Sequence, residues 1–167
     1  MMKKIGMTLM FTLTVLFVKA QSPFDKKITE AIKQLSCAVA SEEIPVTLNA
    51  RIVTEMDSAA VIVKIQISPG WHVYQHVPTS MPYIALEHIL KLPEDVKPIG
   101  TWIVSPPIPS VQDEGVLIYE NEAWFVHKIQ TVGEKKQDSI IRAGVYYQAC
   151  DLRQCLRPSE LALDLKM

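Results

Sequence analysis

The stretch VTLNARIVTEMDSAAVIVKIQIS, residues 46–68, decides the fold of this chain. Apolar side chains alternate with mostly polar ones in Val46–Val53 and again in Ala59–Ser68, which is the period of two that β-strands produce. The short turn Met56–Ser58 separates the two runs, and Pro69–Gly70 ends the second. The stretch therefore predicts an antiparallel hairpin.

Further stretches with strand character follow at similar spacing, and residues typical of turns separate them. The other candidate strands are Ile84–Leu90, Val96–Val104, Ala123–Ile129, Ile140–Tyr147 and Leu161–Leu165. About seven short strands with no helix alternating between them predict an all-β, antiparallel β-sandwich.

A short helix is predicted before the first strand. Ser22 is suited to the N-cap, Pro23 to the first helical position, and Asp25 to a capping box with Ser22. Apolar residues then recur at helical spacing between Ile28 and Leu35. We expect this helix to pack on the sandwich; the alternative is a helix that binds a partner.

The first twenty residues have the pattern of a secretory signal peptide. Lys3 and Lys4 precede an apolar run that ends at Val18, and the segment up to Ala20 suits cleavage by a signal peptidase. An uncleaved membrane anchor is the alternative, but the run is short for a spanning helix. The expected organisation is a signal peptide (1–20), an N-terminal helix and linker (21–45) and one sandwich domain (46–167).

The charge of the mature chain argues against a nucleic-acid partner. Without Lys3, Lys4 and Lys19, fourteen basic residues face eighteen acidic ones, a net charge of −4. No basic stripe or aromatic stacking platform offsets this mild acidity. Beyond the signal peptide we expect no stable membrane insertion.

Two cysteines close together carry the chemistry. If Val145–Ala149 is a strand and the chain turns back after Gln154, Cys150 and Cys155 face each other across a hairpin and can form a disulfide. Closing so short a loop stabilises the fold by only about 2 kcal/mol, so the bond would contribute little as a purely structural disulfide. Cys37 is left over, and we interpret it as a free thiol outside this pair.

The loop between the two cysteines is polar, with Asp151 and Arg153 inside it and Arg157 after it. Accessible sulfur beside cationic side chains favours thiolate formation and rapid exchange. A plain structural disulfide remains the alternative interpretation of this spacing.

These residues resemble a known family. Tyr147–Cys150, together with Cys155 and Pro158, resembles the end of the periplasmic N-terminal domain of the thiol:disulfide interchange protein DsbD. Gly70–Tyr74 and Pro98–Trp102 resemble earlier segments of the same domain. The resemblance implies an immunoglobulin-like sandwich in the periplasm that carries electrons from a membrane thiol reductase to thioredoxin-like partners.

The resemblance also implies roles for single residues. Cys155 would form mixed disulfides with partners and Cys150 would resolve them, with Tyr74 and Tyr147 close to the pair. The alternative for each tyrosine is a place in the sandwich core with its hydroxyl at the rim. The family shields its cysteines with a cap loop that contains acidic residues.

Asp113 and Glu114 correspond to these acidic residues and could accept or hand on a proton. This chain lacks the aromatic pair of that loop, and its cysteines are one residue closer than in the best-known members.

The predicted function is therefore thiol–disulfide exchange, an activity of the protein-disulfide reductase type without cofactor or metal. A non-catalytic binding module with a structural hairpin disulfide is the alternative. A third hypothesis, a metallochaperone that uses the cysteines with His72 or His76, is weakened because residues four apart on a strand lie about 13 Å from each other.

Overall fold

The computed structural model describes residues 22–56, 58–132 and 139–167 of the chain. The predicted signal peptide lies outside these residues, and no helix within them is long and apolar enough to cross a membrane. The elements are α1 (Pro23–Gln34), β1 (Val46–Glu55), β2 (Ser58–Ile67), β3 (His72–His76), β4 (Glu87–Lys91), β5 (Val96–Val104), β6 (Ile108–Pro109), β7 (Leu117–Glu120), β8 (Glu122–Thr131), β9 (Ile140–Tyr147), β10 (Ala149–Cys150) and β11 (Ser159–Lys166).

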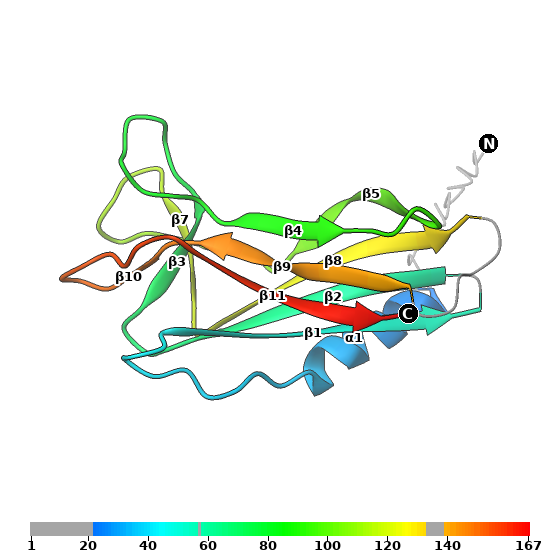
Figure 1. The fold of residues 1–167 in the computed structure, drawn as a ribbon. Helices are drawn as coiled ribbons and strands as arrows, with labels where there is room; N and C mark the ends of the chain where they lie inside the picture. The colour runs from blue at the N-terminus through cyan, green and yellow to red at the C-terminus, as the bar shows by residue number, and fades with distance from the viewer. Residues whose placement is uncertain (1–21, 57, 133–138) are drawn as a thin grey trace, which may run out of the picture.

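The strands form an immunoglobulin-like antiparallel β-sandwich with a short N-terminal helix, which confirms the predicted fold class (Figure 1). One sheet has the strand order β1-β2-β8-β5 and another the order β11-β9-β4. These two sheets and α1 make up what we call the body. The remaining sheet, β10-β3-β7-β6, lies with the loops 77–86, 110–116 and 151–154 at one end of the molecule, which we call the tip.

The hairpin predicted from residues 46–68 is the start of the body. Its register pairs Val46 with Ile67 and Glu55 with Ser58. β2 lies between β1 and β8 and is buried on both faces along most of its length. Val61, Val63 and Ile65 belong to the main core, while Ala60 and Ile62 on the other face pack beneath α1. Because both faces are covered, the strand alternates less strictly in polarity than β1 does.

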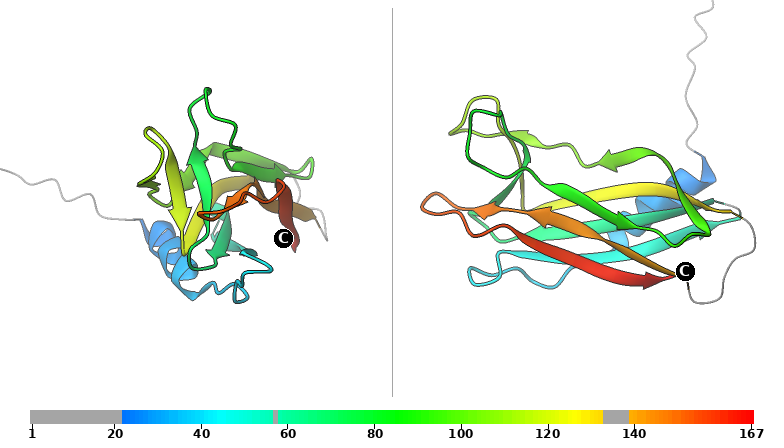
Figure 2. Two further views of the ribbon diagram at one scale, coloured as in Figure 1. Left: turned by 90° about the vertical axis from the view of Figure 1, so that its left-hand side faces the viewer. Right: turned by 45° about the horizontal axis from the view of Figure 1, so that its top comes forward.

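The helix forms a third layer on the outer face of this sheet (Figure 2). Ser22 caps it as predicted, because its Oγ accepts the N–H of Asp25 at 3.1 Å. The apolar side of α1 then packs against residues of β1, β2 and β8, and the prediction of a helix packed on the sandwich is confirmed. The residues in this contact are Ile28, Ala31, Leu35, Val53, Ala60, Ile62 and Val126.

Three short strands were not predicted. β6 forms where a turn was expected at residues 105–109, with Ile108 opposite Ile118 and Pro109 opposite Leu117. Pro109 is tolerated there because β6 is an edge strand and needs fewer backbone donors. β7 follows, and at Asn121, whose φ is 62°, the chain leaves this sheet and enters β8 of the sheet β1-β2-β8-β5. β10, described below, is the third.

Candidate redox site at the tip

The disulfide region begins where the chain changes sheets. β9 ends at Tyr147, and after Gln148 the chain continues as β10, which pairs with β3 and no longer with the partners of β9. Ala149 lies opposite Val73, and Cys150 lies opposite His72. This switch moves Cys150 from the body to the tip.

A tight hairpin then returns the chain. The Asp151 carboxylate accepts the N–H groups of Arg153 and Gln154, both at 2.7 Å, and these bonds lower the pKa of Asp151. Outside the loop, the N–H of Leu156 donates to the carbonyl of Ala149 at 2.9 Å. Short polar turns of this kind hold a hairpin closed.

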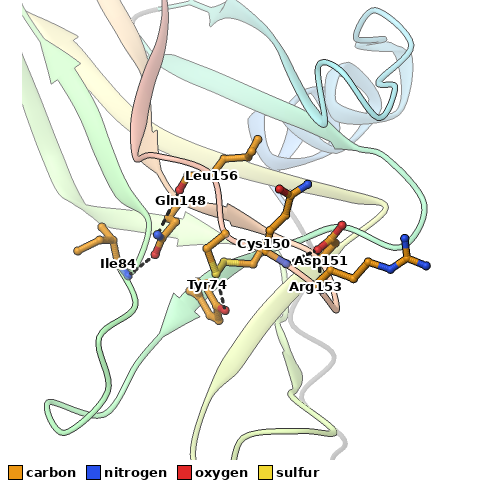
Figure 3. The surroundings of a disulfide bond; sticks show 9 residues. Tyr74, Ile84, Gln148, Cys150, Asp151, Arg153 and Leu156 are labelled. Atoms are coloured by element: carbon orange, nitrogen blue, oxygen red, sulfur yellow. Dashed lines mark hydrogen bonds between the residues drawn. A yellow bond between two sulfur atoms is a disulfide. The ribbon is translucent and has the colours of Figure 1, made fainter.

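The result is the predicted disulfide. Cys150 and Cys155 form an antiparallel bridge, and their sulfur atoms are bonded at 2.03 Å (Figure 3). The two residues differ sharply in exposure, because Cys150 is 1% exposed while Cys155 lies in the exposed part of the loop. Cys150 packs in a small cluster with Tyr74, Val116 and Ile118. One half of the disulfide is therefore buried and the other accessible.

Tyr74 is the side chain of the site that approaches the accessible half. Its hydroxyl lies 4.0 Å from Cys155 Sγ, and its ring stacks on Tyr83 with 4.7 Å between centroids. Burial raises the pKa of Tyr74 to about 12, and the charges of Tyr83 and Asp113 act in the same direction. The hydroxyl therefore stays protonated at neutral pH and can donate to a sulfur that becomes negatively charged.

The loop 110–116 places Asp113 near this group. Ser110 Oγ accepts the N–H of Asp113 at 3.2 Å, and the N–H of Ser110 donates to the carbonyl of Val116 at 2.9 Å. Asp113 is close enough to raise the pKa of Tyr74 and to oppose the lowering of the His72 pKa by burial. Glu114 is exposed, and within the described residues no hydrogen bond or ion pair joins it to the site.

Tyr147 lies elsewhere. It is buried in the main core of the body, opposite Ser159 of β11, and within the part of the chain described here no hydrogen bond joins it to either cysteine. The structure thus brings Tyr74 and Asp113 toward the disulfide, but not Glu114 or Tyr147.

Two residues of the site were not recognised in the sequence. Tyr83 reaches Tyr74 from the loop between β3 and β4, and no local pattern indicates this contact. Gln148 connects that loop to the segment after Cys155. Its position in the Tyr147–Cys150 motif was the one available signal.

The other groups considered for chemistry are the two histidines of β3 and the third cysteine. His72 and His76 lie on β3, which is a strand as expected, and no group of three or more metal-binding side chains gathers within the described ranges. Cys37 is a free, half-buried thiol whose Sγ donates to the Lys64 carbonyl at 3.2 Å. Burial raises the pKa of Cys37, which lowers its reactivity.

An open groove of about 580 Å³ runs beside the disulfide loop. The loop residues Asp151–Gln154 form one wall, and Glu42, Glu43 and Trp71 contribute to the others. Leu152, which is 78% exposed, stands at its edge. The tip thus combines an accessible sulfur with a concave, partly acidic surface.

Fold and site together define a β-sandwich with a disulfide hairpin at one end, in which one cysteine residue is buried and the other exposed. No protein-family model matches the chain, and no curated protein matches it.

Among solved structures, the chain is similar to the N-terminal domain of DsbD from Neisseria meningitidis in the reduced form, at 17% identity and a TM-score of 0.49, over 82% of this chain and 93% of that one. It is also similar to the GAE domain of yeast GGA1, at 8% identity and a TM-score of 0.40, over 78% and 96% of the two chains. The GAE domain of GGA2p from Saccharomyces cerevisiae is similar at 6% identity and a TM-score of 0.41, over 80% of this chain and 97% of that one.

Proposed function

We propose that this protein is an exported thiol–disulfide exchange protein of the DsbD N-terminal type, which passes electrons between thioredoxin-fold partners through Cys150 and Cys155. The observation that carries the proposal is the unequal exposure of the two cysteine residues. Cys150 is 1% exposed, whereas Cys155 is exposed at the tip. A disulfide that served only as a staple would close a loop too short to stabilise the fold by more than about 2 kcal/mol.

The asymmetry gives the exchange reaction a direction. A partner thiolate attacks Cys155 Sγ, the S–S bond breaks, and the electron pair leaves with Cys150 as a thiolate that takes up a proton. A second partner thiol then attacks the partner's own sulfur in the mixed disulfide and releases Cys155. The partner ends as a disulfide, and Cys150 and Cys155 end as two thiols, so two electrons have moved.

Tyr74 and Asp113 assist the step in which Cys155 leaves the mixed disulfide as a thiolate. The Tyr74 hydroxyl, 4.0 Å from Cys155 Sγ, donates to the thiolate of Cys155 when that residue leaves. Asp113 favours the protonated form of that hydroxyl. Glu114 and Tyr147 were also predicted as site residues, but their positions give them no direct part in this mechanism.

The cellular setting follows from the same proposal. The predicted signal peptide exports the chain to the periplasm, where a membrane thiol reductase supplies electrons and thioredoxin-like proteins accept them. The groove beside the loop, with exposed Leu152 at its edge, is the surface on which such partners would seat.

The first experiment is the reduction potential of the Cys150–Cys155 couple, measured in dithiothreitol redox buffers with thiols trapped by a mass tag. We use a Cys37→Ser background, so that only the couple is counted. A value between about −180 and −270 mV, the range of known thiol carriers, supports the proposal. A value below about −300 mV marks a structural disulfide and supports the binding-module alternative instead.

A pair of matched variants tests which sulfur receives the partner. In the same background, reduced Cys150→Ser retains the exposed thiol and Cys155→Ser retains the buried one. Each is mixed with a thioredoxin whose exposed cysteine has been activated with thionitrobenzoate, and the released dye is followed. We expect Cys150→Ser to react at least about tenfold faster, because accessibility limits exchange. Equal rates would overturn the assigned order.

A further inference from the structure

Gln148 is hydrogen-bonded on both sides at the point where the chain passes from β9 to β10. Its Oε1 accepts the N–H of Ile84 at 3.0 Å, and its Nε2 donates to the carbonyl of Leu156 at 3.2 Å (Figure 3). The side chain is half-buried. A single amide therefore joins the loop before β4 to the segment just after Cys155.

The two ends of this bridge converge on Cys155. Leu156 follows Cys155 directly, so the bond to its carbonyl restrains the backbone next to the accessible sulfur. Ile84 follows Tyr83, whose ring stacks on Tyr74 at 4.7 Å between centroids. The Tyr74 hydroxyl in turn lies 4.0 Å from Cys155 Sγ.

The bridge matters most when the disulfide is open. In the oxidised protein the S–S bond itself holds Cys155 opposite Cys150. After reduction, only non-covalent contacts hold the hairpin, chiefly the turn bonds to Asp151, the Leu156–Ala149 backbone bond and the Gln148 bridge. Holding two reacting groups together raises the effective concentration of one at the other.

We propose that Gln148 is a positioning residue that keeps the reduced Cys155 thiol opposite Cys150 and beside Tyr74. This inference rests on the proposed function, because it assigns a role within the same redox couple. It explains why a polar side chain able both to donate and to accept stands at the change of sheets. If Gln148 served only to satisfy backbone groups there, its loss would weaken the oxidised and reduced forms alike and leave the disulfide equilibrium unchanged.

The test is the equilibrium of the couple with glutathione in the Cys37→Ser background. Gln148→Met keeps the length of the side chain and removes both hydrogen bonds. The matched control is Gln112→Met, the same change in another exposed loop of the tip, because Gln112 lies outside the groove and uses only its backbone in the described contacts. We expect Gln148→Met to lower the equilibrium constant for disulfide formation five- to tenfold, and tenfold corresponds to about 30 mV.

A second variant separates the two arms and protects the test if Gln148→Met fails to fold. At pH 7.5 the carboxylate of Gln148→Glu still accepts the Ile84 N–H but cannot donate to Leu156. Because the Leu156 arm adjoins Cys155, we expect most of the loss to remain in this variant. If every folded Gln148 variant gave the wild-type equilibrium constant, as we expect of Gln112→Met, the inference would be overturned.

Trapping the mixed disulfide with glutathione supplies an independent readout. Resolution requires the Cys150 thiolate to attack Cys155 Sγ and expel glutathione thiolate, so misplacement of Cys155 should raise the steady-state glutathione adduct several-fold in Gln148→Met. Unchanged adduct levels would count against the inference. The proposed function fails separately, through a wild-type potential below about −300 mV, and that result leaves the comparison between variants measurable.

Discussion

The body and the tip of the sandwich use their residues differently. In the body, side chains such as Ile62, Phe125 and Ile141 are fully buried between layers of regular structure. At the tip, short strands and loops leave Leu152 and Cys155 exposed, and a few hydrogen bonds hold the turns. The body thus supplies stability and the tip supplies accessible chemistry, so a change in one should leave the principal observable of the other unaltered.

The largest effect is expected from a cavity in the body. Ile62 is fully buried in β2 and packs in the cluster beneath α1, which contains no residue of the tip. Ile62→Ala should lower the free energy of unfolding by about 2–5 kcal/mol, measured by urea denaturation of the oxidised protein. The reduction potential of the folded variant should match that of the wild type. A clear shift in potential would show that body and tip are coupled.

Opening the disulfide should have a smaller effect. A loop of this length contributes about 2 kcal/mol, so the reduced wild-type protein should stay folded and unfold at a modestly lower urea concentration. Urea denaturation with and without dithiothreitol gives the difference. If reduction alone unfolds the chain, the disulfide is required for folding. In that case the tip contributes to stability, and the division of roles between body and tip is wrong.

The smallest of the three effects is the response to acid, and it belongs to the body. His88 stacks on Trp102, its Nε2 is buried without a hydrogen-bond partner among the described residues, and burial, with the nearby His127, lowers its pKa from 6.5 to about 4. Because the unfolded chain binds this proton more readily, the stabilisation is complete above about pH 6.5 and is lost as the pH falls toward 4.

We expect that loss to be about 1–2 kcal/mol, after discounting the shift for partial exposure of the ring. His88→Phe keeps an aromatic ring in the stack and removes the titration, so the difference in unfolding free energy between pH 7 and pH 4 should shrink by this amount. An unchanged pH profile would assign the acid sensitivity to other groups, such as His72, whose pKa burial also lowers.

Local patterns predicted the parts of the fold that local physics controls. The alternation in residues 46–68 predicted the β1–β2 hairpin, and Ser22, Pro23 and Asp25 predicted the start of α1, because periodicity and caps are properties of neighbouring residues. β6 and β10, with two residues each, are too short to give a periodic signal.

For Tyr147, the family resemblance and the burial period of β9 predict different positions. Along β9, Ile141, Ala143 and Val145 are buried at every second position, and Tyr147 continues that series into the core. The alternation therefore already favoured a core position over one beside the disulfide.

The sequence by itself determined the longer strands, the helix and the pairing of Cys150 with Cys155, because these depend on residues within a few positions of one another. Only the tertiary structure decided that Cys150 is buried and Cys155 exposed, and which side chains face them. Tyr74 meets Cys155 across 81 residues of sequence, and Gln148 meets Ile84 across 64. Periodicity tells which face of a strand is buried but not which strands become neighbours, and the packing of the sheets settles that.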